Sequence, residues 1–422
     1  MDPLSFFSQE ELSTWAAQAD LNSFLHLTTI GIKVLFALVV VGAGVHVALR
    51  RGCERLGLRI YGGSDKPRRV FRVFERLSDP TGNEPSRWVT DLVYPIALTM
   101  IWSVVILPIS YFGSFVLGHE RGLVTMSAGL WWSDWAKSML LGSVFYGFLG
   151  VGLFGLARRL PRTWWLLLWG AVAGMLLVWS MLSPYRAKLY NEFKELAPGP
   201  ARTAVESIMA KAGIKLSHVQ VVNTSKRSRH AAAFVMGTGP TRRVVLGDNL
   251  VRRFHPREIM VALGHELGHE REKHQDRGWI SLSLAALVFL ILVRLILLWA
   301  PRVRRLGLRP DADPAVLPII FLMLLILFSA NSPLSAWLDR QEEHEADMAG
   351  LELTRDPVAF CSLMVRLART NQADVDPPEW RHWFWEHHPT VKQRIEYAMK
   401  WGKEHHVPVG PGAVPLYVDV HR

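Results

Sequence analysis

Two histidines four residues apart form the part of the sequence with the clearest capacity for chemistry. His265 and His269 bound an H-E-x-x-H pattern, and on a helix this spacing places both imidazoles on one face, one turn apart. Two imidazoles so placed can bind a single Zn²⁺ ion. Glu266 lies beside them and could accept a proton from a water molecule that the metal activates. The segment 258–274 therefore indicates a zinc-binding helix.

The alternative for this segment is a charged surface helix that happens to carry two histidines. The residues just before the pattern, 260–264, are apolar and end in a glycine, whereas a solvated helix would be charged there. The pattern is also typical of metalloproteases, in which the glutamate is the general base. The sequence therefore favours a metal site with Glu266 as the base.

A catalytic zinc needs a third protein ligand and one open position, and an acidic segment downstream could supply the ligand. Glu343 and Asp347 are four residues apart within 340–350, so they lie on one face of a helix. One could bind zinc while the other orients a histidine ligand. A solvated acidic helix face explains the same residues equally well when the segment is considered alone.

The elements that must position these residues include several membrane-spanning helices. Half of the 422 residues are hydrophobic, and the mean hydropathy is positive. A helix needs about 20 apolar residues to cross a bilayer. Six segments meet this requirement: 30–49, 92–112, 138–156, 164–182, 279–299 and 315–334. We therefore expect a multi-pass protein of the cell membrane, or of the inner membrane if the source is Gram-negative.

The charge and the cysteines exclude other classes of protein. The net charge is +11, but the basic residues fall in particular loops, which suits membrane orientation better than nucleic-acid binding. We therefore expect the lipid bilayer as a partner and no nucleic acid. Cys53 and Cys361 are the two cysteines and lie far apart, which excludes a disulfide framework.

The distribution of apolar and polar segments predicts four regions. They are 1–27, an N-terminal interfacial segment; 28–182, a membrane domain of about four spans; 183–400, a domain that carries the zinc helix and includes a membrane hairpin at 279–334; and 401–422, a tail. The spacing of Ser8 and Glu11 predicts a capping box that starts a short interfacial helix. The tail from Val407 is rich in proline and glycine, which predicts irregular structure.

Within the zinc domain, the pattern predicts helices around a small sheet. Short strands are expected at 219–222 and 244–246, because β-branched residues cluster there between turn signals. Helices are expected at 201–212, 338–353, 357–369 and 389–400. The chain as a whole is therefore predicted to be mainly α-helical.

The combined motifs resemble those of the M48 metallopeptidases, and more closely those of the Ste24 type, the CAAX prenyl protease branch. The H-E-x-x-H pattern and Glu343-x-x-x-Asp347 carry the resemblance. Further similar segments are 225–228 with His230, 243–246 with Asp248, His388-Pro389 with Arg394-Ile395 and, upstream, Leu107-Pro108, 120–122 and 132–134 with Lys137. The similarity covers about residues 90–400.

The resemblance implies a multispanning helical membrane protein with a zincin-like α+β peptidase domain. It also implies hydrolysis of peptide bonds by activated water, with one zinc ion per chain. The ligands would be His265, His269 and Glu343, the base would be Glu266, and Asp347 would orient a histidine ligand. The substrate would be a polypeptide, either a prenylated CAAX-type C-terminal peptide or a misfolded, membrane-embedded protein.

Two further residues gain a role from the resemblance alone. His388 and Arg394 would polarise the scissile carbonyl and support the oxyanion or the geometry of the site, because a fixed donor stabilises the negative charge of a tetrahedral intermediate. Without the motif, His388 would be a surface histidine and Arg394 a solvated charge on a helix.

The chain departs from the family pattern in two places. The family has Asn-Ala-Tyr on the strand that aligns the substrate, where this chain has Ala232-Ala233-Phe234. The asparagine amide is therefore absent, but pairing by the backbone of an edge strand needs no side chain. Eukaryotic members have seven spans, whereas six are predicted here.

Two other classes of function remain as alternatives. A non-hydrolytic membrane scaffold or chaperone could keep a structural zinc, but it would have no use for the base at Glu266. A channel or transporter needs ionisable residues within its spans, and Lys33, His46 and Arg294 are the candidates that the sequence offers. An enzyme is therefore favoured.

The charge pattern and the family resemblance place the active site on opposite sides of the membrane. Short cytoplasmic loops are enriched in Lys and Arg, and the loops 50–88, 157–163 and 301–313 hold nearly all of the short-loop arginines. Four spans precede the peptidase domain, so this domain would return to the extracytoplasmic side. Ste24-type domains face the cytosol. The charge pattern favours the extracytoplasmic side.

Overall fold

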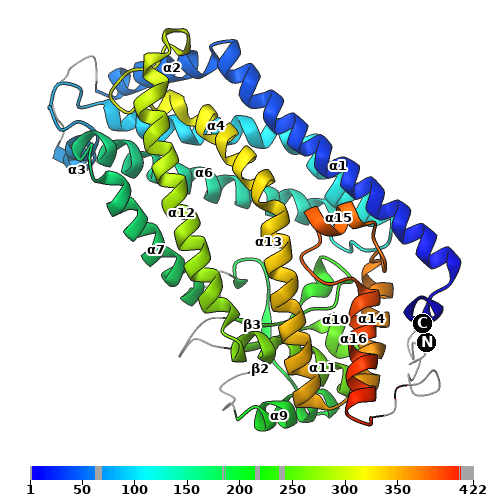
Figure 1. Cartoon of the computed structure of the whole chain (residues 1–422). Coiled ribbons are helices and arrows are strands. Elements are labelled where there is room, and N and C mark those ends of the chain that lie inside the picture. The colour runs from blue at the N-terminus through cyan, green and yellow to red at the C-terminus, as the bar shows by residue number, and fades with distance from the viewer. Residues whose placement is uncertain are drawn as a thin grey trace.

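A computed structural model of the chain describes residues 2–61, 69–182, 185, 187–213, 219–236, 243–407 and 409. Long helices form an elongated membrane domain, and a smaller unit of helices and a short sheet lies at one end of it (Figure 1). The mainly helical fold predicted from the sequence is confirmed. Most of the predicted C-terminal tail lies outside the described residues.

In the described part of the chain, seven long helices form the membrane domain. They are α1 (Gln9–Gly42), α2 (Val45–Ile60), α4 (Arg87–Tyr111), α6 (Ala128–Arg159), α7 (Trp164–Met181), α12 (His274–Trp299) and α13 (Leu317–Thr354). Short helices α3 (Arg72–Ser78) and α5 (Leu117–Glu120) join them. By length and composition, five helical segments of the described chain can cross a membrane: those at 9–42, 87–120, 128–159, 274–302 and 314–354. The remaining predicted span, 164–182, corresponds to α7, whose apolar stretch Trp164–Val178 is shorter.

The N-terminal segment differs from its prediction. The capping box of Ser8 and Glu11 is present, but the helix that it starts continues to Gly42 instead of ending before the first span. The predicted first span, 30–49, is also wrong at its C-terminal end. Gly44 adopts a left-handed conformation (φ 69°), which separates α1 from α2.

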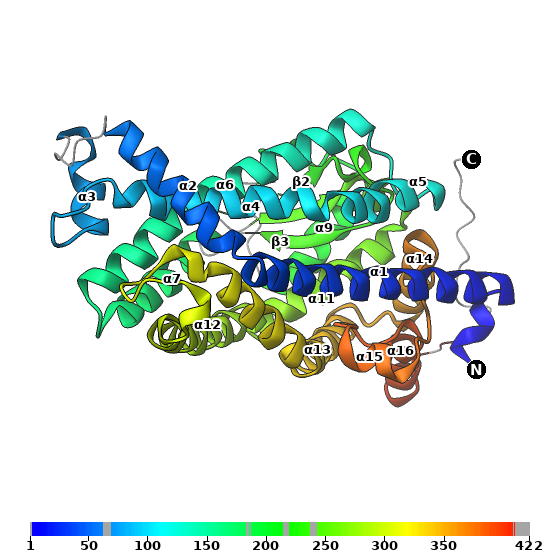
Figure 2. The same ribbon diagram turned by 90° about the horizontal axis from the view of Figure 1, so that it is seen from above.

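The start of α1 packs on the peptidase unit. Phe7 and Trp15 are buried in the same hydrophobic cluster as the zinc helix, and the guanidinium of Arg369 donates a 2.8 Å hydrogen bond to Glu11. Figure 2 shows α1 reaching from the membrane helices toward α14. The N-terminus and the zinc domain therefore lie at the same end of the molecule.

The sheet has four strands in the order β1-β2-β4-β3: β1 (Phe193–Glu195), β2 (Val219–Val222), β4 (Arg243–Gly247) and β3 (Ala233–Met236). β2 and β4 are parallel and central, and β1 and β3 pair with them in antiparallel fashion. The two strands predicted from clustered β-branched residues are the central pair. β3 forms an edge of the sheet as the described strands define it.

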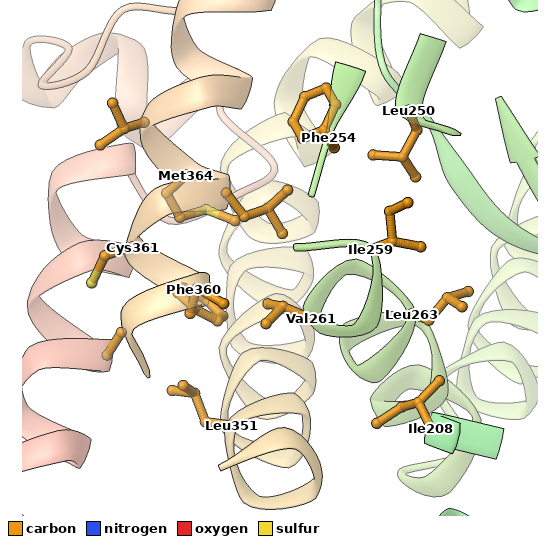
Figure 3. Packing of buried hydrophobic residues seen from close by; sticks show 14 of the residues in the cluster. Ile208, Leu250, Phe254, Ile259, Val261, Leu263, Leu351, Phe360, Cys361 and Met364 are labelled. Atoms are coloured by element: carbon orange, nitrogen blue, oxygen red, sulfur yellow. The ribbon is translucent and has the colours of Figure 1, made fainter. Parts of the chain in front are cut away.

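Helices cover this sheet and enclose the core of the peptidase unit. They are α9 (Pro200–Lys211), α10 (Asp248–Arg253), α11 (Pro256–Arg271), α14 (Pro357–Asn371), α15 (Glu379–Phe384) and α16 (Val391–Glu404). Ile259 and Leu263 of α11 are fully buried on the side of α11 where Leu250 of α10 and Ile208 of α9 lie, while Phe360 of α14 lies on the other side (Figure 3). This core fixes α11 between the sheet and the C-terminal helices.

The sixth predicted span and the acidic helix after it form one continuous helix. The sequence predicts separate segments at 315–334 and 338–353, but α13 runs from Leu317 to Thr354 with Pro333 inside it. A proline within a helix removes one backbone hydrogen bond, which can be tolerated in a membrane helix. The carboxylates predicted for the metal site are thus carried on the extension of a membrane helix.

Small residues let α11 and α13 approach very closely. A Cβ atom on Gly268 would lie 2.7 Å from the carbonyl oxygen of Ala346, and one on Gly350 would lie 2.9 Å from the backbone nitrogen of His265. Real Cβ atoms essentially never come so near to backbone atoms. The two glycines therefore set the separation between the H-E-x-x-H helix and the acidic helix.

We predict that Gly268→Ala destabilises the protein. Alanine in a helix is favoured over glycine by about 0.5–1 kcal/mol, but a methyl group forced against the α13 backbone should cost about 1–3 kcal/mol. Thermal unfolding in detergent should therefore show a lower midpoint. Gly278→Ala is the matched control, because a Cβ there would meet nothing within 4 Å. A Gly268→Ala protein as stable as the control would contradict the prediction.

Candidate metal centre

Helix α11 is fixed at its start by a capping box. The side chain of His255 accepts a hydrogen bond from the backbone of Arg257, Pro256 occupies the first turn, and Glu258 accepts a 2.8 Å bond from the His255 backbone. The helix was predicted to continue to His274, but it ends at Arg271. Lys273 is left-handed (φ 57°), and α12 begins at His274. The two histidines of the pattern lie in the last two turns of α11.

The three predicted ligands converge. The Nε2 atoms of His265 and His269 lie 3.2 Å apart. Glu343 Oε2 is 3.3 Å from His265 Nε2, and Glu343 Oε1 is 3.4 Å from His269 Nε2. One ligand atom from each residue lies within 4.8 Å of the other two. Residues about 75 positions apart in the chain are therefore arranged around one point.

The chemistry of this donor set fits a zinc ion. Two imidazole nitrogens and one carboxylate oxygen are the ligands of a catalytic zinc site, which keeps a fourth position open. Glu343 Oε2 is buried and accepts no hydrogen bond from any described residue. An unsatisfied buried carboxylate oxygen is costly, and a cation at this point would satisfy it.

Asp347 and Arg394 lie behind His265, on the side away from the ligand atoms. His265 Nδ1 is 2.8 Å from Asp347 Oδ1. Arg394 donates hydrogen bonds of 2.8 and 2.5 Å to the two oxygens of the same carboxylate. Burial alone would lower the pKa of His265, but the adjacent carboxylates of Asp347 and Glu343 raise it to about 9. The Asp347 carboxylate is thus placed to hold the orientation of His265.

A cavity of about 500 Å³ opens beside the ligands. Glu266, His388, Arg394 and the 231–233 segment at the start of β3 line it. Burial raises the pKa of Glu266 above its ordinary value, and the neighbouring histidines lower it. A carboxylate with a raised pKa is suited to accept and return a proton near neutral pH.

His388 and Arg394 differ in their surroundings. The side chain of His388 is 61% exposed, and its Nε2 lies 3.5 Å from Glu343 Oε2, so it is available to a group bound in the cavity. The Arg394 side chain is only 12% exposed and its guanidinium is engaged with Asp347. Of the two roles that the resemblance implies for Arg394, support of the site geometry fits these contacts better.

Sequence reasoning missed one part of the site. His269 Nδ1 is 2.8 Å from His274 Nδ1, and His274 Nε2 is 2.9 Å from Glu345 Oε2. A straight helix through 274 would turn this histidine about 140° away from His269. The sequence therefore carried no signal for the contact, which depends on the break at Lys273.

Comparisons with known proteins agree with this geometry. Residues 199–402 match the model of peptidase family M48, and residues 68–187 match a model described as CAAX prenyl protease N-terminal, five membrane helices. The fold is similar to the crystal structure of Ste24p from S. mikatae, with a TM-score of 0.79 and 20% sequence identity over 93% of this chain and 90% of that chain.

Two curated relatives illustrate the range of similarity. The uncharacterized metalloprotease YhfN of Bacillus subtilis is 25% identical over 402 residues, which is 94% of this chain and 88% of the relative. CAAX prenyl protease 1 of Saccharomyces cerevisiae is 30% identical over 185 residues, which is 42% of this chain. The match spans 40% of the yeast protein's length.

We predict that Glu343→Gln clearly weakens zinc retention. The amide keeps the size of the side chain but removes the charge that a ligand carboxylate contributes. Metal analysis after dialysis should find close to one zinc per wild-type chain and much less in the variant. Glu342→Gln, one position earlier and about 100° around the helix, is the control and should retain zinc. Equal retention in the two variants would remove Glu343 from the ligand set.

Proposed function

The chain belongs to peptidase family M48 and is a metallopeptidase of the Ste24, CAAX prenyl protease type, and from this premise we propose that it is a zinc endopeptidase acting on polypeptides at the membrane. It is a multi-pass membrane protein. The observation that carries the proposal is the convergence of His265, His269 and Glu343 beside Glu266, at a cavity bordered by an edge strand.

Each residue of the site has a task in peptide hydrolysis. An extended substrate would pair with β3 at the edge of the sheet that the described strands form, because Ala233, the first residue of β3, and the two residues before it line the cavity. Glu266 would take a proton from the attacking water and deliver it to the leaving amine. His388 would donate a hydrogen bond to the carbonyl oxygen as negative charge develops there. Arg394 would hold Asp347, which in turn holds His265.

His265, His269 and Glu343 would hold the zinc ion. Such an ion lowers the pKa of water toward ~7 and polarises a carbonyl oxygen. Ala232 stands where the family has asparagine, so this chain lacks one side-chain donor to the substrate. Backbone hydrogen bonds along β3 would therefore supply a larger part of the affinity for the substrate.

Two substrate classes fit the site. Part of the cavity lining is apolar, with the buried residues Leu250, Phe360, Leu363 and Met364, and this part suits aliphatic side chains of either class. One class is the C-terminal CAAX-type peptide, which the name of the yeast relative suggests. The other is a misfolded membrane protein, which the attachment of the site to membrane helices would favour.

The alternative is a non-hydrolytic membrane scaffold or chaperone that contains zinc. Glu266 discriminates between the two, because it lies in the cavity beside the ligands and a structural metal has no need of a base. The enzyme is the stronger interpretation, since the family comparison also indicates a metalloprotease.

We predict that Glu266→Gln abolishes hydrolysis while zinc and fold persist. Glutamine keeps the shape of the side chain but cannot accept a proton, and general-base catalysis typically contributes about 10²–10⁴ in rate. Casein or a model peptide serves as the substrate, and metal analysis with thermal unfolding serves as the control for the site. Turnover near that of the wild type would refute the mechanism.

We further propose that the peptidase unit is extracytoplasmic. The described parts of the three basic loops meet at the end of the molecule remote from the sheet (Figure 1). Arg309 pairs with Glu54 at 2.9 Å, and Arg158 donates a hydrogen bond to the carbonyl of Asp311 at 3.0 Å. Because cytoplasmic loops are basic, this end would face the cytoplasm and the peptidase unit would face away from it. The family resemblance predicts the opposite orientation.

Single cysteines at the two ends test the orientation. Ser207 of α9 and Arg305 of the 301–313 loop are exposed, whereas the native Cys53 and Cys361 are buried. We expect Ser207→Cys to react with an impermeant maleimide on intact cells, and Arg305→Cys to react only after permeabilisation. Labelling of Arg305→Cys alone on intact cells would refute the charge argument and place the active site in the cytosol.

A further inference from the structure

His274 is a buried histidine with a hydrogen-bond partner at each ring nitrogen. It is 5% exposed. Its Nδ1 lies 2.8 Å from Nδ1 of His269, and its Nε2 lies 2.9 Å from Oε2 of Glu345. Arg277 donates a 2.9 Å hydrogen bond to the same glutamate oxygen. The ring therefore connects a predicted metal ligand to a carboxylate on α13.

The backbone is shaped to make this contact. Helix α11 ends at Arg271, and Lys273 adopts φ 57°, a left-handed conformation that non-glycine residues rarely take. Non-glycine residues in this conformation cost about 1–3 kcal/mol and persist where surrounding contacts require them. Here the break brings the rings of His269 and His274 to a centroid distance of 5.0 Å, at 74° to each other.

One arrangement of protons lets each nitrogen and oxygen in this series of contacts form its hydrogen bond. His269 presents Nε2 to the other ligands, so its proton is on Nδ1 and is donated to Nδ1 of His274. The proton of His274 is then on Nε2 and is donated to Glu345. This arrangement sets His269 as the tautomer that leaves Nε2 free for a metal.

Carboxylates on a single helix, α13, thus hold both of the predicted histidine ligands. His265 bonds directly to Asp347, whereas His269 reaches Glu345 through His274. With Glu343 as a ligand, α13 supplies three carboxylates to the site within five residues. Groups that orient metal-bound histidines in this way typically change metal affinity 10–100-fold when they are removed.

We propose that His274, backed by Glu345, is a positioning residue that fixes the ring orientation and tautomer of His269. This proposal rests on the zinc-dependent function above, because it concerns a ligand of that zinc. It adds a residue to the site that neither the H-E-x-x-H pattern nor the acidic motif contains.

The test compares two substitutions in the full-length protein in detergent. His274→Phe keeps a ring but removes both nitrogens, and His274→Asn restores an acceptor near the position of Nδ1. Zinc affinity is measured by competition with a chelator, and thermal unfolding of the zinc-free proteins monitors the fold. We expect about 10–100-fold weaker zinc binding for His274→Phe and binding within a few-fold of wild type for His274→Asn. Turnover at saturating zinc should show a lower kcat for His274→Phe with an unchanged KM.

The outcomes separate this proposal from the proposed function. If wild-type protein binds no zinc, the proposed function fails and the positioning role fails with it. If wild type binds zinc and a folded His274→Phe protein binds it equally well, the positioning role alone is overturned. Equal losses in the Phe and Asn variants would also overturn it, because the acceptor would then be irrelevant. If His274→Phe does not fold, Glu345→Ala is used instead, because Glu345 is exposed at the surface and its replacement should not disturb the fold. Unchanged zinc affinity in Glu345→Ala would overturn the positioning role of His274.

Discussion

The near contact of α11 and α13 is the constraint on which the rest of the structure depends. Helix α11 carries two of the predicted ligands, His265 and His269, and α13 carries the third, Glu343. The Gly268 and Gly350 positions bring the helices so close that a single methyl group would collide with backbone. At this separation the carboxylate of Glu343 reaches both imidazoles within 3.4 Å. The packing of α11 against α13 therefore also brings the predicted ligands together.

The sequence predicts local features of this site better than its three-dimensional connections. A four-residue spacing determines which side chains share a helical face, so the pairs His265–His269 and Glu343–Asp347 could be found without a structure. The prediction that these two helical faces meet required the family resemblance, because nothing in either segment indicates that it packs against the other. The contact of His274 could not be found in either way, because it depends on one left-handed residue at position 273.

The same distinction applies to the elements of the fold. β2 and β4 were predictable because their side chains are apolar and β-branched, as a buried central strand requires. The length of α1 and the continuity of α13 were not, because a polar segment next to an apolar one suggests a boundary. In both helices the polar part is stabilised by the peptidase unit: Arg381 donates a 2.9 Å hydrogen bond to Asp20 of α1, and Asp347 of α13 pairs with Arg394.

Continuity of α13 connects the metal site to the far end of the membrane domain. At that end Asp91 forms a bidentate pair with Arg158, at 2.6 and 2.7 Å, and the side chains are 0% and 4% exposed. Arg158 also donates to the carbonyl of Ala312 at 3.0 Å, and Asp313 pairs with Arg50. Buried ion pairs add little net stability, because desolvation offsets their attraction, but removing one partner is costly.

These pairs therefore act mainly by fixing position. They hold the chain just before α13, and the α11 contact holds α13 near its other end. Helix α13 has 38 residues and is about 57 Å long at 1.5 Å per residue. If the chain before α13 shifted by one residue along the helix axis, Glu343 would move by about 1.5 Å unless the helix bent at Pro333. Metal ligands tolerate errors of only about 0.2 Å in their distances. The packing of the membrane helices is thus part of what determines the geometry of the hydrolytic site.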